Sequence, residues 1–286
     1  MGTVTALRRY PVKSMLGEAL TGVAVTGRGL HGDRVFAVLD GAGTVGSVKH
    51  PRKWGPLLRC GGRLGSTGEV TVELPDGVAL PAGDPDLDAR LSRLLGRDVS
   101  LSNTPSDIPG EHGGVLERVV PEYEGGVPTA LRSTATTDAT GAAITSGRVA
   151  PGTFFDYGTV HLVTTSALAR LRTACPTGDF DPRRFRPNLV VDLPDGPDFP
   201  EDAWTHASLR IGGALFRVVV PTPRCVVPTL AQEELPADPA IMRTVAREHR
   251  VPVLDLGRLS CVGVYLDVLE PGTVRIGDPV TLLGSA

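Results

Sequence analysis

The sequence predicts a mainly β fold of the α+β class, built from many short strands and a few helices. Of its 286 residues, 35 are glycine and 25 are proline, scattered among short runs of Val, Leu, Ile and Thr. Such punctuation is typical of strands joined by turns, and it argues against a helical bundle. A chain of this length can bury a sizeable core, either as one large β-rich domain or as two smaller ones.

The charge and the cysteines narrow the class of protein. The formal net charge is −3 and the isoelectric point is near 6.1, which argues against non-specific nucleic-acid binding. We find no signal peptide and no apolar run that approaches the roughly 20 residues of a membrane span, so we expect a cytoplasmic protein without membrane contact. The cysteines form no C-x-x-C pair and no zinc-type cluster, which fits free thiols in a reducing compartment. They are Cys60, Cys175, Cys225 and Cys261.

In the first half, apolar and alternating runs predict strands separated by turns that contain Gly or Pro. These strands cover residues 4–12, 20–26, 33–39, 45–48, 57–64 and 69–74. Residues 86–95 predict the first helix, because apolar positions share one face, acidic residues stand at its start and Gly96 follows its end. We expect this helix to cap a β-barrel or sandwich.

Two polar motifs stand out beside these strands. Lys13 and Ser14 follow the first strand, and a cation beside a hydroxyl suits a phosphate, although an exposed turn is the commoner meaning of such a pair. Arg34 lies at the start of a later strand. Its alternative interpretation is an ion pair with Asp33 or Asp40 at the rim of the strand.

The second half begins after residues 103–152, whose Gly, Pro, Thr and Ser content predicts an inter-domain crossing with mobile loops. Strands are predicted at residues 159–163, 188–192, 214–220, 261–269, 273–276 and 280–283. Thr165 and Ser166 belong to a hydroxyl cluster that predicts a helix N-cap, and this cap could also face a phosphate. Asp238 and Pro239 predict a second helix, running to about His249.

The segment 183–188 predicts an anion clamp. Pro187 favours an extended Arg186, and alternation then places Arg184 and Arg186 on one face of the chain. Two guanidinium groups on one face suit a phosphate or a carboxylate. The alternative is a solvated strand end balanced by Asp179 and Asp181.

The segment 221–229 predicts a stiff loop, because three prolines in eight residues prevent a paired central strand. Cys225 lies within it, directly after Arg224. A neighbouring cation favours the thiolate, the form of sulfur that acts as a nucleophile or a metal ligand. The alternative is that Cys225 is a small buried apolar residue.

Taken together, six motifs along nearly the whole chain resemble those of MOSC-domain proteins that carry the N-terminal MOSC β-barrel domain, a group that includes the amidoxime-reducing components. The motifs are residues 10–14, Gly32-Asp33-Arg34, residues 161–166, residues 184–188, Arg224-Cys225 and residues 271–280. The resemblance implies an N-terminal β-barrel-like domain at residues 1–115. It also implies a C-terminal MOSC β-barrel with a few peripheral helices at residues 116–286.

The resemblance further implies a molybdenum-cofactor enzyme that reduces N-hydroxylated small molecules. Cys225 matches the family's metal ligand, and a soft thiolate suits molybdenum that a dithiolene already holds. Carried over residue by residue, the contacts to the pterin and its phosphate fall on Lys13, Ser14, Arg34, Arg186 and Asn188, and further contacts fall on Thr165, Ser166 and Arg224. Pyridoxal phosphate has little support, because none of the three lysines has a recognisable Schiff-base setting.

The sequence also departs from the family pattern. Relatives commonly follow the cysteine with Thr-Thr-x-Asp, whereas residues 226–229 here are Val-Val-Pro-Thr. We expect no ferredoxin-like domain of the kind that some bacterial relatives carry, and therefore a separate electron donor such as a ferredoxin, a flavodoxin or a cytochrome b5-like protein with its reductase. Two other functions remain open: a sulfur-transfer protein with a persulfide on Cys225, and a non-catalytic protein that binds the cofactor.

Overall fold

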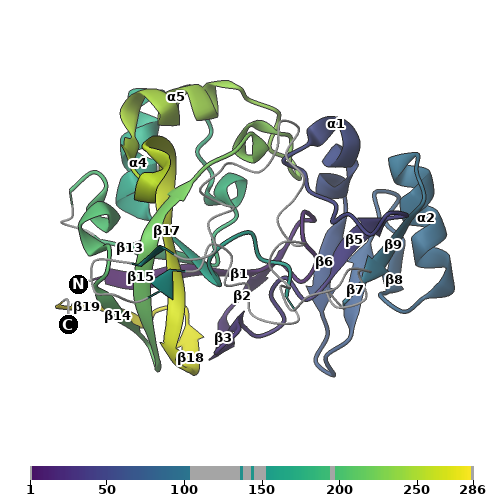
Figure 1. Ribbon diagram of the computed structural model, residues 1–286, viewed down its shortest axis with the longest axis horizontal. Coiled ribbons are helices and arrows are strands. Elements are labelled where there is room, and N and C mark those ends of the chain that lie inside the picture. The colour runs from purple at the N-terminus through teal and green to yellow at the C-terminus, as the bar shows by residue number, and fades with distance from the viewer. Residues whose placement is uncertain (1, 104–135, 138–142, 145–152, 194–196, 285–286) are drawn as a thin grey trace. The chain divides into compact units, whose positions relative to one another are not determined.

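The computed structural model describes residues 2–103, 136–137, 143–144, 153–193 and 197–284 (Figure 1). The chain forms two compact units. The first comprises Met1–Arg9, Ala19–His31 and Thr159–Ala286, and the second comprises Tyr10–Glu18 and Gly32–Gly158. Most of the crossing predicted at residues 103–152 lies outside the described residues, as does the domain boundary predicted after residue 115, which stays a prediction.

Strands of the first unit close into a seven-strand barrel. In spatial order they are β12 (Val160–Thr164), β13 (Leu189–Asp192), β1 (Gly2–Arg9), β19 (Pro279–Leu283), β14 (Ser208–Ile211), β15 (Ala214–Pro223) and β17 (Arg258–Glu270). Antiparallel pairing of β17 with β12 closes the ring, and β12 runs parallel to β13. The predicted mainly β fold is therefore confirmed.

The barrel interior is filled by the inward-facing side chains of these strands. In β14, for example, Leu209 and Ile211 are buried and alternate with more exposed neighbours, as the two-residue period of a strand requires. They pack with Leu7, Leu162 and Phe216 in one core cluster. Short strands complete this unit: β2 (Glu18–Leu20) and β16 (Arg250–Pro252) extend the main sheet, and β3 (Gly22–Thr26), β4 (Gly29–Leu30) and β18 (Gly272–Arg275) form a separate sheet.

Helices α4 (Thr165–Ala174) and α5 (Ala240–Glu248) lie side by side against the barrel (Figure 1). Both begin as the sequence predicts: Thr164 Oγ1 accepts from Ala167 N at 3.2 Å, and Asp238 Oδ1 accepts from Ala240 N at 2.8 Å. Their apolar faces meet in a second core cluster with a residue of β17. Its members include Leu168, Leu171, Ile241, Val245 and Val262.

The second unit contains small sheets and one long helix. β5 (Ala37–Asp40) pairs with β9 (Val99–Ser102), and β7 (Val70–Glu73) lies between β6 (Gly61–Leu64) and β8 (Ala79–Pro81). Helix α2 (Pro85–Leu95) begins at Asp84 and ends at the left-handed Gly96, which confirms its prediction. Within the described residues, its other helical segments are α1 (Pro51–Trp54) and η1 (Gly55–Arg59). β10 (Thr136–Thr137) and β11 (Ala143–Ile144) form a separate pair.

Three strand predictions in this unit were wrong in part. The strand predicted at residues 33–39 begins only at Ala37, because the residues before it form a turn in which Arg34 is left-handed, with φ 54°. Residues 45–48 make a single bridge, between Leu39 and Val45, because a tight turn follows Asp40. Residues 57–59 belong to η1, where a proline at the second position fits the start of a helical turn. In the described part of the chain, no helix combines the length and the hydropathy that a membrane crossing requires.

Candidate functional site

Cys225 lies in the loop between β15 and the short helix η6 (Val227–Thr229). The predicted stiff loop begins later than expected, because β15 continues through Pro221 and Pro223, which face Val264 and Cys261 of β17. Between Val218 and Pro223, the register of β15 against β17 shifts twice, and β14 pairs with β15 no further than Arg217. The prolines therefore lie where β15 has a partner strand on one side only and where its pairing is irregular. Cys225 is partly exposed at the end of a well-anchored strand.

The other cysteines have different settings. Cys60 and Cys261 are buried, and burial raises the pKa of each thiol to about 12. A thiol with such a pKa carries almost no thiolate at neutral pH. Cys175 is partly exposed, and its hydrogen bond with Thr177 lowers the pKa of its thiol. Among the described residues, no group of three or more His, Cys, Asp and Glu side chains is arranged to hold a metal ion.

The predicted clamp of Arg184 and Arg186 on one extended face was wrong. Residues 182–185 form the short helix η4 (Pro182–Phe185), and Arg186 follows it in the left-handed region, with φ 54° and ψ 46°. The hydrogen bond from Arg186 N to Arg183 O, at 3.0 Å, closes this turn. Arg186 is partly exposed, whereas Arg184 is fully buried. The two guanidinium groups therefore do not form one anion site.

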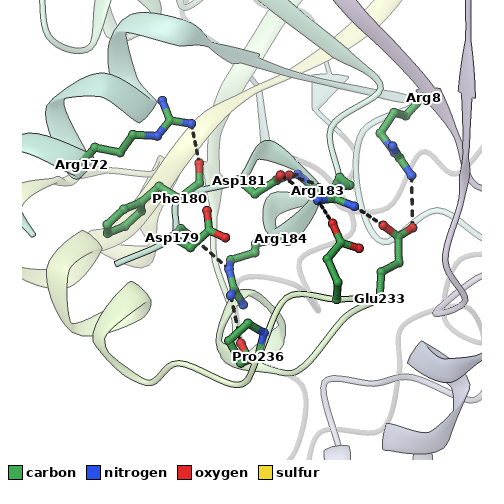
Figure 2. Close-up of polar contacts among 10 residues, drawn as sticks. Arg8, Arg172, Asp179, Phe180, Asp181, Arg183, Arg184, Glu233 and Pro236 are labelled. Carbon is green, nitrogen blue, oxygen red and sulfur yellow. Dashed lines mark hydrogen bonds and ion pairs between the residues drawn. The ribbon is translucent and has the colours of Figure 1, made fainter. Parts of the chain in front are cut away.

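Arg184 instead donates to backbone carbonyls of two segments, one before η4 and one after Cys225 (Figure 2). Its Nε donates to Asp179 O at 2.8 Å, and its Nη2 donates to Pro236 O at 2.9 Å. Longer bonds run from Nη1 to Pro228 O, at 3.3 Å, and to Leu230 O, at 3.4 Å. Arg184 thereby fastens the segment that follows Cys225 to η4.

The neighbouring Arg183 lies in a partly exposed cluster of charges (Figure 2). It pairs with Asp181 at 2.9 Å, and it also contacts Glu233 and Glu234. Arg8 reaches Glu233 at 3.6 Å. The carboxylates of this cluster have cationic partners, so the cluster adds a second fastening of the segment after Cys225.

Arg224 is held against η4 as well. Its Nη2 donates to Phe185 O at 2.7 Å, and its guanidinium carbon lies 5.8 Å from the centre of the Phe185 ring. Its Nε is buried, as is Thr222 Oγ1, and neither atom has a hydrogen-bond partner among the described residues. Buried polar atoms are nearly always paired, so two unpaired ones within three residues of Cys225 fit a site that receives a polar ligand.

The other predicted contacts of this unit have protein partners. Asn188 is buried, accepting from His161 N at 3.1 Å and donating to Arg8 O at 3.2 Å, so it joins neighbouring segments of the barrel. Thr165 Oγ1 donates to the Asp192 carboxylate at 2.5 Å, and Ser166 Oγ donates to Leu193 O at 3.3 Å. The roles of Arg186, Asn188, Thr165 and Ser166 in cofactor binding stay predictions.

The second unit holds a compact cluster of cations. Lys13 is buried and donates to Asp156 Oδ1 at 2.7 Å and to Phe154 O at 2.8 Å, while Lys49 lies 3.1 Å from the same Asp156 oxygen. Burial lowers the pKa of Lys13 to about 8, even though Asp156 acts in the opposite direction. Removal from water favours protonated Asp156, but the two lysines hold the pKa of this carboxyl well below its usual range.

Ser14 and Arg34 belong to the same unit. Both have left-handed backbones, with φ 69° and φ 54°. Ser14 Oγ accepts from Val48 N at 3.2 Å and lies 3.4 Å from Gly46 O. Arg34 lies 2.7 Å from Asp33, the ion pair considered above, and its guanidinium stands 4.3 Å from the Tyr10 ring centre. Their contacts to a cofactor stay predictions.

Some residues of these clusters were not predicted from the sequence. Lys49 carried one signal, the rarity of lysine, which is present at only three positions. Asp156 and Thr222 carried none, because an acid in a Gly-rich stretch and a threonine in a strand are ordinary features. Lys13 and Asp156 form a hydrogen bond although 143 positions separate them in the sequence, so no local pattern indicates the pair.

A further titratable cluster lies where α5 meets β17. His249 Nδ1 is 2.8 Å from Cys261 O and His249 Nε2 is 2.8 Å from Asp202 Oδ2, so both ring nitrogens face acceptors and both can donate. Burial favours the neutral ring, but these hydrogen bonds outweigh it and raise the pKa of His249. Glu201 is also buried, which raises its pKa, and it accepts from Thr164 Oγ1 at 2.7 Å.

Comparison with known families identifies the chain. Residues 151–281 match the MOSC domain, and residues 1–93 match the MOSC N-terminal beta barrel domain. The chain is a MOSC-domain protein with a MOSC N-terminal beta barrel domain. The family resemblance noted in the sequence is therefore confirmed.

Curated relatives of this MOSC protein include amidoxime-reducing components. It is 30% identical to mitochondrial amidoxime reducing component 2 of Homo sapiens over 129 residues, which cover 44% of this chain and 37% of the human protein. It is 24% identical to mitochondrial amidoxime-reducing component 1 of Mus musculus over 298 residues, which cover 99% of this chain and 83% of that protein. The match to the human protein thus spans little more than a third of its length.

Among solved structures, the chain resembles the YUAD protein from Bacillus subtilis with a TM-score of 0.45 and 11% identity, over 98% of this chain and 93% of that one. It also resembles YiiM from Geobacillus stearothermophilus, with a TM-score of 0.31 and 19% identity, over 44% and 55% of the two chains.

Proposed function

We propose that this MOSC protein binds a molybdenum cofactor through Cys225 and reduces N-hydroxylated small molecules. The observation that carries the proposal is the setting of Cys225, a partly exposed thiol that follows Thr222 and Arg224 within three residues; Thr222 Oγ1 and Arg224 Nε are buried and have no hydrogen-bond partner among the described residues. The amidoxime-reducing relatives add the reaction class, although one of the two matches spans only a minor part of the relative.

The donor set fits the chemistry of such a cofactor. A thiolate is a soft ligand suited to molybdenum, and the cofactor's phosphate calls for cations and hydrogen-bond donors. Cys225 would supply the sulfur. The cations Lys13 and Arg34 and the hydroxyl group of Ser14 are suited to a phosphate. When bound, the cofactor supplies two-electron removal of oxygen from nitrogen.

The reaction proposed converts an N–OH group, two electrons and two protons into an N–H group and water. The electrons would come from a separate donor protein, such as a ferredoxin, a flavodoxin or a cytochrome b5-like protein with its reductase. Val226 follows Cys225 and is 39% exposed, so it offers an apolar surface beside the sulfur. We expect an aromatic or aliphatic group of the substrate to contact Val226.

Turnover by the holoprotein tests the proposal. Protein from a cofactor-competent host is supplied anaerobically with a reduced viologen and an aromatic amidoxime, and the amidine is quantified by mass spectrometry. We expect turnover by the wild type, its loss in Cys225→Ser and its retention in Cys175→Ser, the matched change at the other partly exposed thiol. Cofactor-loaded protein that yields no product would overturn the reductase assignment.

The same preparations distinguish the sulfur-transfer alternative. A persulfide on Cys225 releases thiocyanate when it is treated with cyanide, and it requires no molybdenum. Cyanide-releasable sulfur that disappears in Cys225→Ala, together with absence of amidine formation, would assign the protein to sulfur transfer.

A further inference from the structure

Two cations of the second unit share one carboxylate oxygen. Asp156 Oδ1 lies 2.7 Å from Lys13 Nζ and 3.1 Å from Lys49 Nζ. The Lys13 side chain is 5% exposed, whereas that of Asp156 is 34% exposed. The anion of this cluster is therefore the member that can reach solvent, while its main cation is fixed inside.

Asp156 does not fully stabilise the charge of Lys13. Burial lowers the pKa of Lys13 to about 8 although Asp156 is in direct contact, and the positive charges of Lys49 and Arg34 lower it further. An anion with more charge than a single carboxylate would compensate Lys13 better. Lys13 would also stay in place without Asp156, because Phe154 O accepts from its ammonium group at 2.8 Å.

We propose that a phosphate-type dianion displaces the Asp156 carboxylate from Lys13 and binds Lys49 as a second cation. In the absence of that dianion, the Asp156 carboxylate occupies its place. The inference rests on the proposed function, in which that dianion is the phosphate of the cofactor. It assigns a binding role to Lys49 and a competing role to Asp156. An exchange of this kind changes no covalent bond, and a dianion with several oxygens can contact both ammonium groups.

The alternative is a permanent structural ion pair, and the two cases predict opposite effects of removing the carboxylate. If Asp156 competes with the ligand, Asp156→Asn strengthens anion binding, because the amide has a similar shape and no charge. If Asp156 only positions the lysines, the same change disorders them and weakens binding. The sign of the change therefore decides between the two.

Calorimetric titration with inorganic phosphate at pH 7 and low ionic strength tests this sign. We expect Asp156→Asn to bind phosphate about tenfold more tightly than the wild type, a difference of about 1.4 kcal/mol. Asp76→Asn is the matched control, because Asp76 pairs with Arg90 at 3.2 Å in the same unit, and we expect unchanged affinity. Equal or weaker binding by Asp156→Asn overturns the proposal.

A second pair of measurements does not depend on the folding of that variant. We expect Lys49→Met to bind phosphate about tenfold more weakly than the wild type. In the wild type at pH 8.5, sulfate binding should take up protons, because the anion returns the pKa of Lys13 toward its ordinary value, and titration in buffers of different ionisation enthalpy measures this uptake. Unchanged affinity in Lys49→Met, or sulfate binding without proton uptake, contradicts the exchange.

Failure of the exchange and failure of the proposed function give different results. Tighter phosphate binding by Asp156→Asn, in a protein that acquires no molybdenum or pterin in a competent host, would support the exchange and refute the proposed function. Molybdenum-loaded protein whose Asp156→Asn variant gains no phosphate affinity would do the reverse.

Discussion

Replacing Arg184 with methionine tests whether this buried cation fastens the segment after Cys225. Methionine fills a similar space but donates no hydrogen bond, so the carbonyls of Asp179, Pro228, Leu230 and Pro236 lose a charged donor. A hydrogen bond from a charged group contributes about 1.5–3 kcal/mol. Counting the bonds of 2.8 and 2.9 Å at the lower value, and the bonds of 3.3 and 3.4 Å at less, predicts a loss of about 3–4 kcal/mol.

Urea unfolding followed by circular dichroism measures this loss. Arg172→Met is the control, because Arg172 is exposed and donates to one carbonyl, Phe180 O, at 2.9 Å (Figure 2). We expect the control to lose about 1 kcal/mol or less, because the exposed Arg172 guanidinium can exchange its single hydrogen bond for one with water. We also expect faster proteolysis of residues 228–236 in Arg184→Met than in the control. Equal losses in the two variants would refute the proposed fastening role of Arg184.

Three further changes probe the first unit. His249→Gln should destabilise the protein most at low pH, because the pKa of His249 is raised in the folded state. The stabilisation that protonated His249 gives the fold is complete below its unfolded pKa of about 6.5 and is lost as pH rises through the folded pKa. Unfolding measured at pH 5.5 and 8.5 tests this. Glu201→Gln should gain stability relative to the wild type as pH rises, because burial raises the pKa of Glu201 and ionisation of its carboxyl weakens the wild-type fold. A difference in unfolding free energy between the two proteins that stays constant across pH 4–8 would contradict this. Gly263→Ala should lower the free energy of unfolding by about 3 kcal/mol or more, because φ is +76° and the added Cβ would lie 2.1 Å from Leu162 O. Gly77→Ala, with φ +81° and open space around the added Cβ, should lower it by only about 1 kcal/mol. Thermal melts of the two variants compare these losses.

Local signals predicted the helices well, because each helix start is encoded within a few residues. Thr164 and Asp238 each accept a backbone N–H of the first turn, and Gly96 takes the left-handed position that ends α2. Strand runs such as residues 214–220 were found for the same reason, since their apolar pattern is continuous. The order of the strands around the barrel is not encoded locally and was not predicted; the family resemblance implied only that the strands form a barrel.

The errors in the site arose where tertiary contacts override a local preference. Pro187 disfavours right-handed helix at Arg186, and an extended conformation was predicted, but the turn that ends η4 selects the left-handed region. Arg184 was assigned to an anion because a pair of arginines suits one. Its real acceptors lie up to 52 residues away, in a loop whose path no periodicity predicts.

Cys225 and Arg224 could be found from the sequence because both stand in one short segment between prolines. The cations of the second unit were harder: Lys13 was found, but the carboxylate that binds it comes from a distant stretch without a motif. Sequence therefore selected candidate groups by their chemical type, and their roles in binding stay predictions. It did not predict which of them are already bound to other protein groups.

The molybdenum and pterin content of purified protein tests the central claim most directly. The wild type and Cys225→Ser are expressed in the same cofactor-competent host, and metal is measured per mole of folded protein by mass spectrometry. We expect close to one molybdenum per wild-type chain, with matching pterin, and a loss of most of the metal in Cys225→Ser. Folded wild-type protein without molybdenum above background, or equal metal in both proteins, would contradict the assignment of Cys225 as a metal ligand.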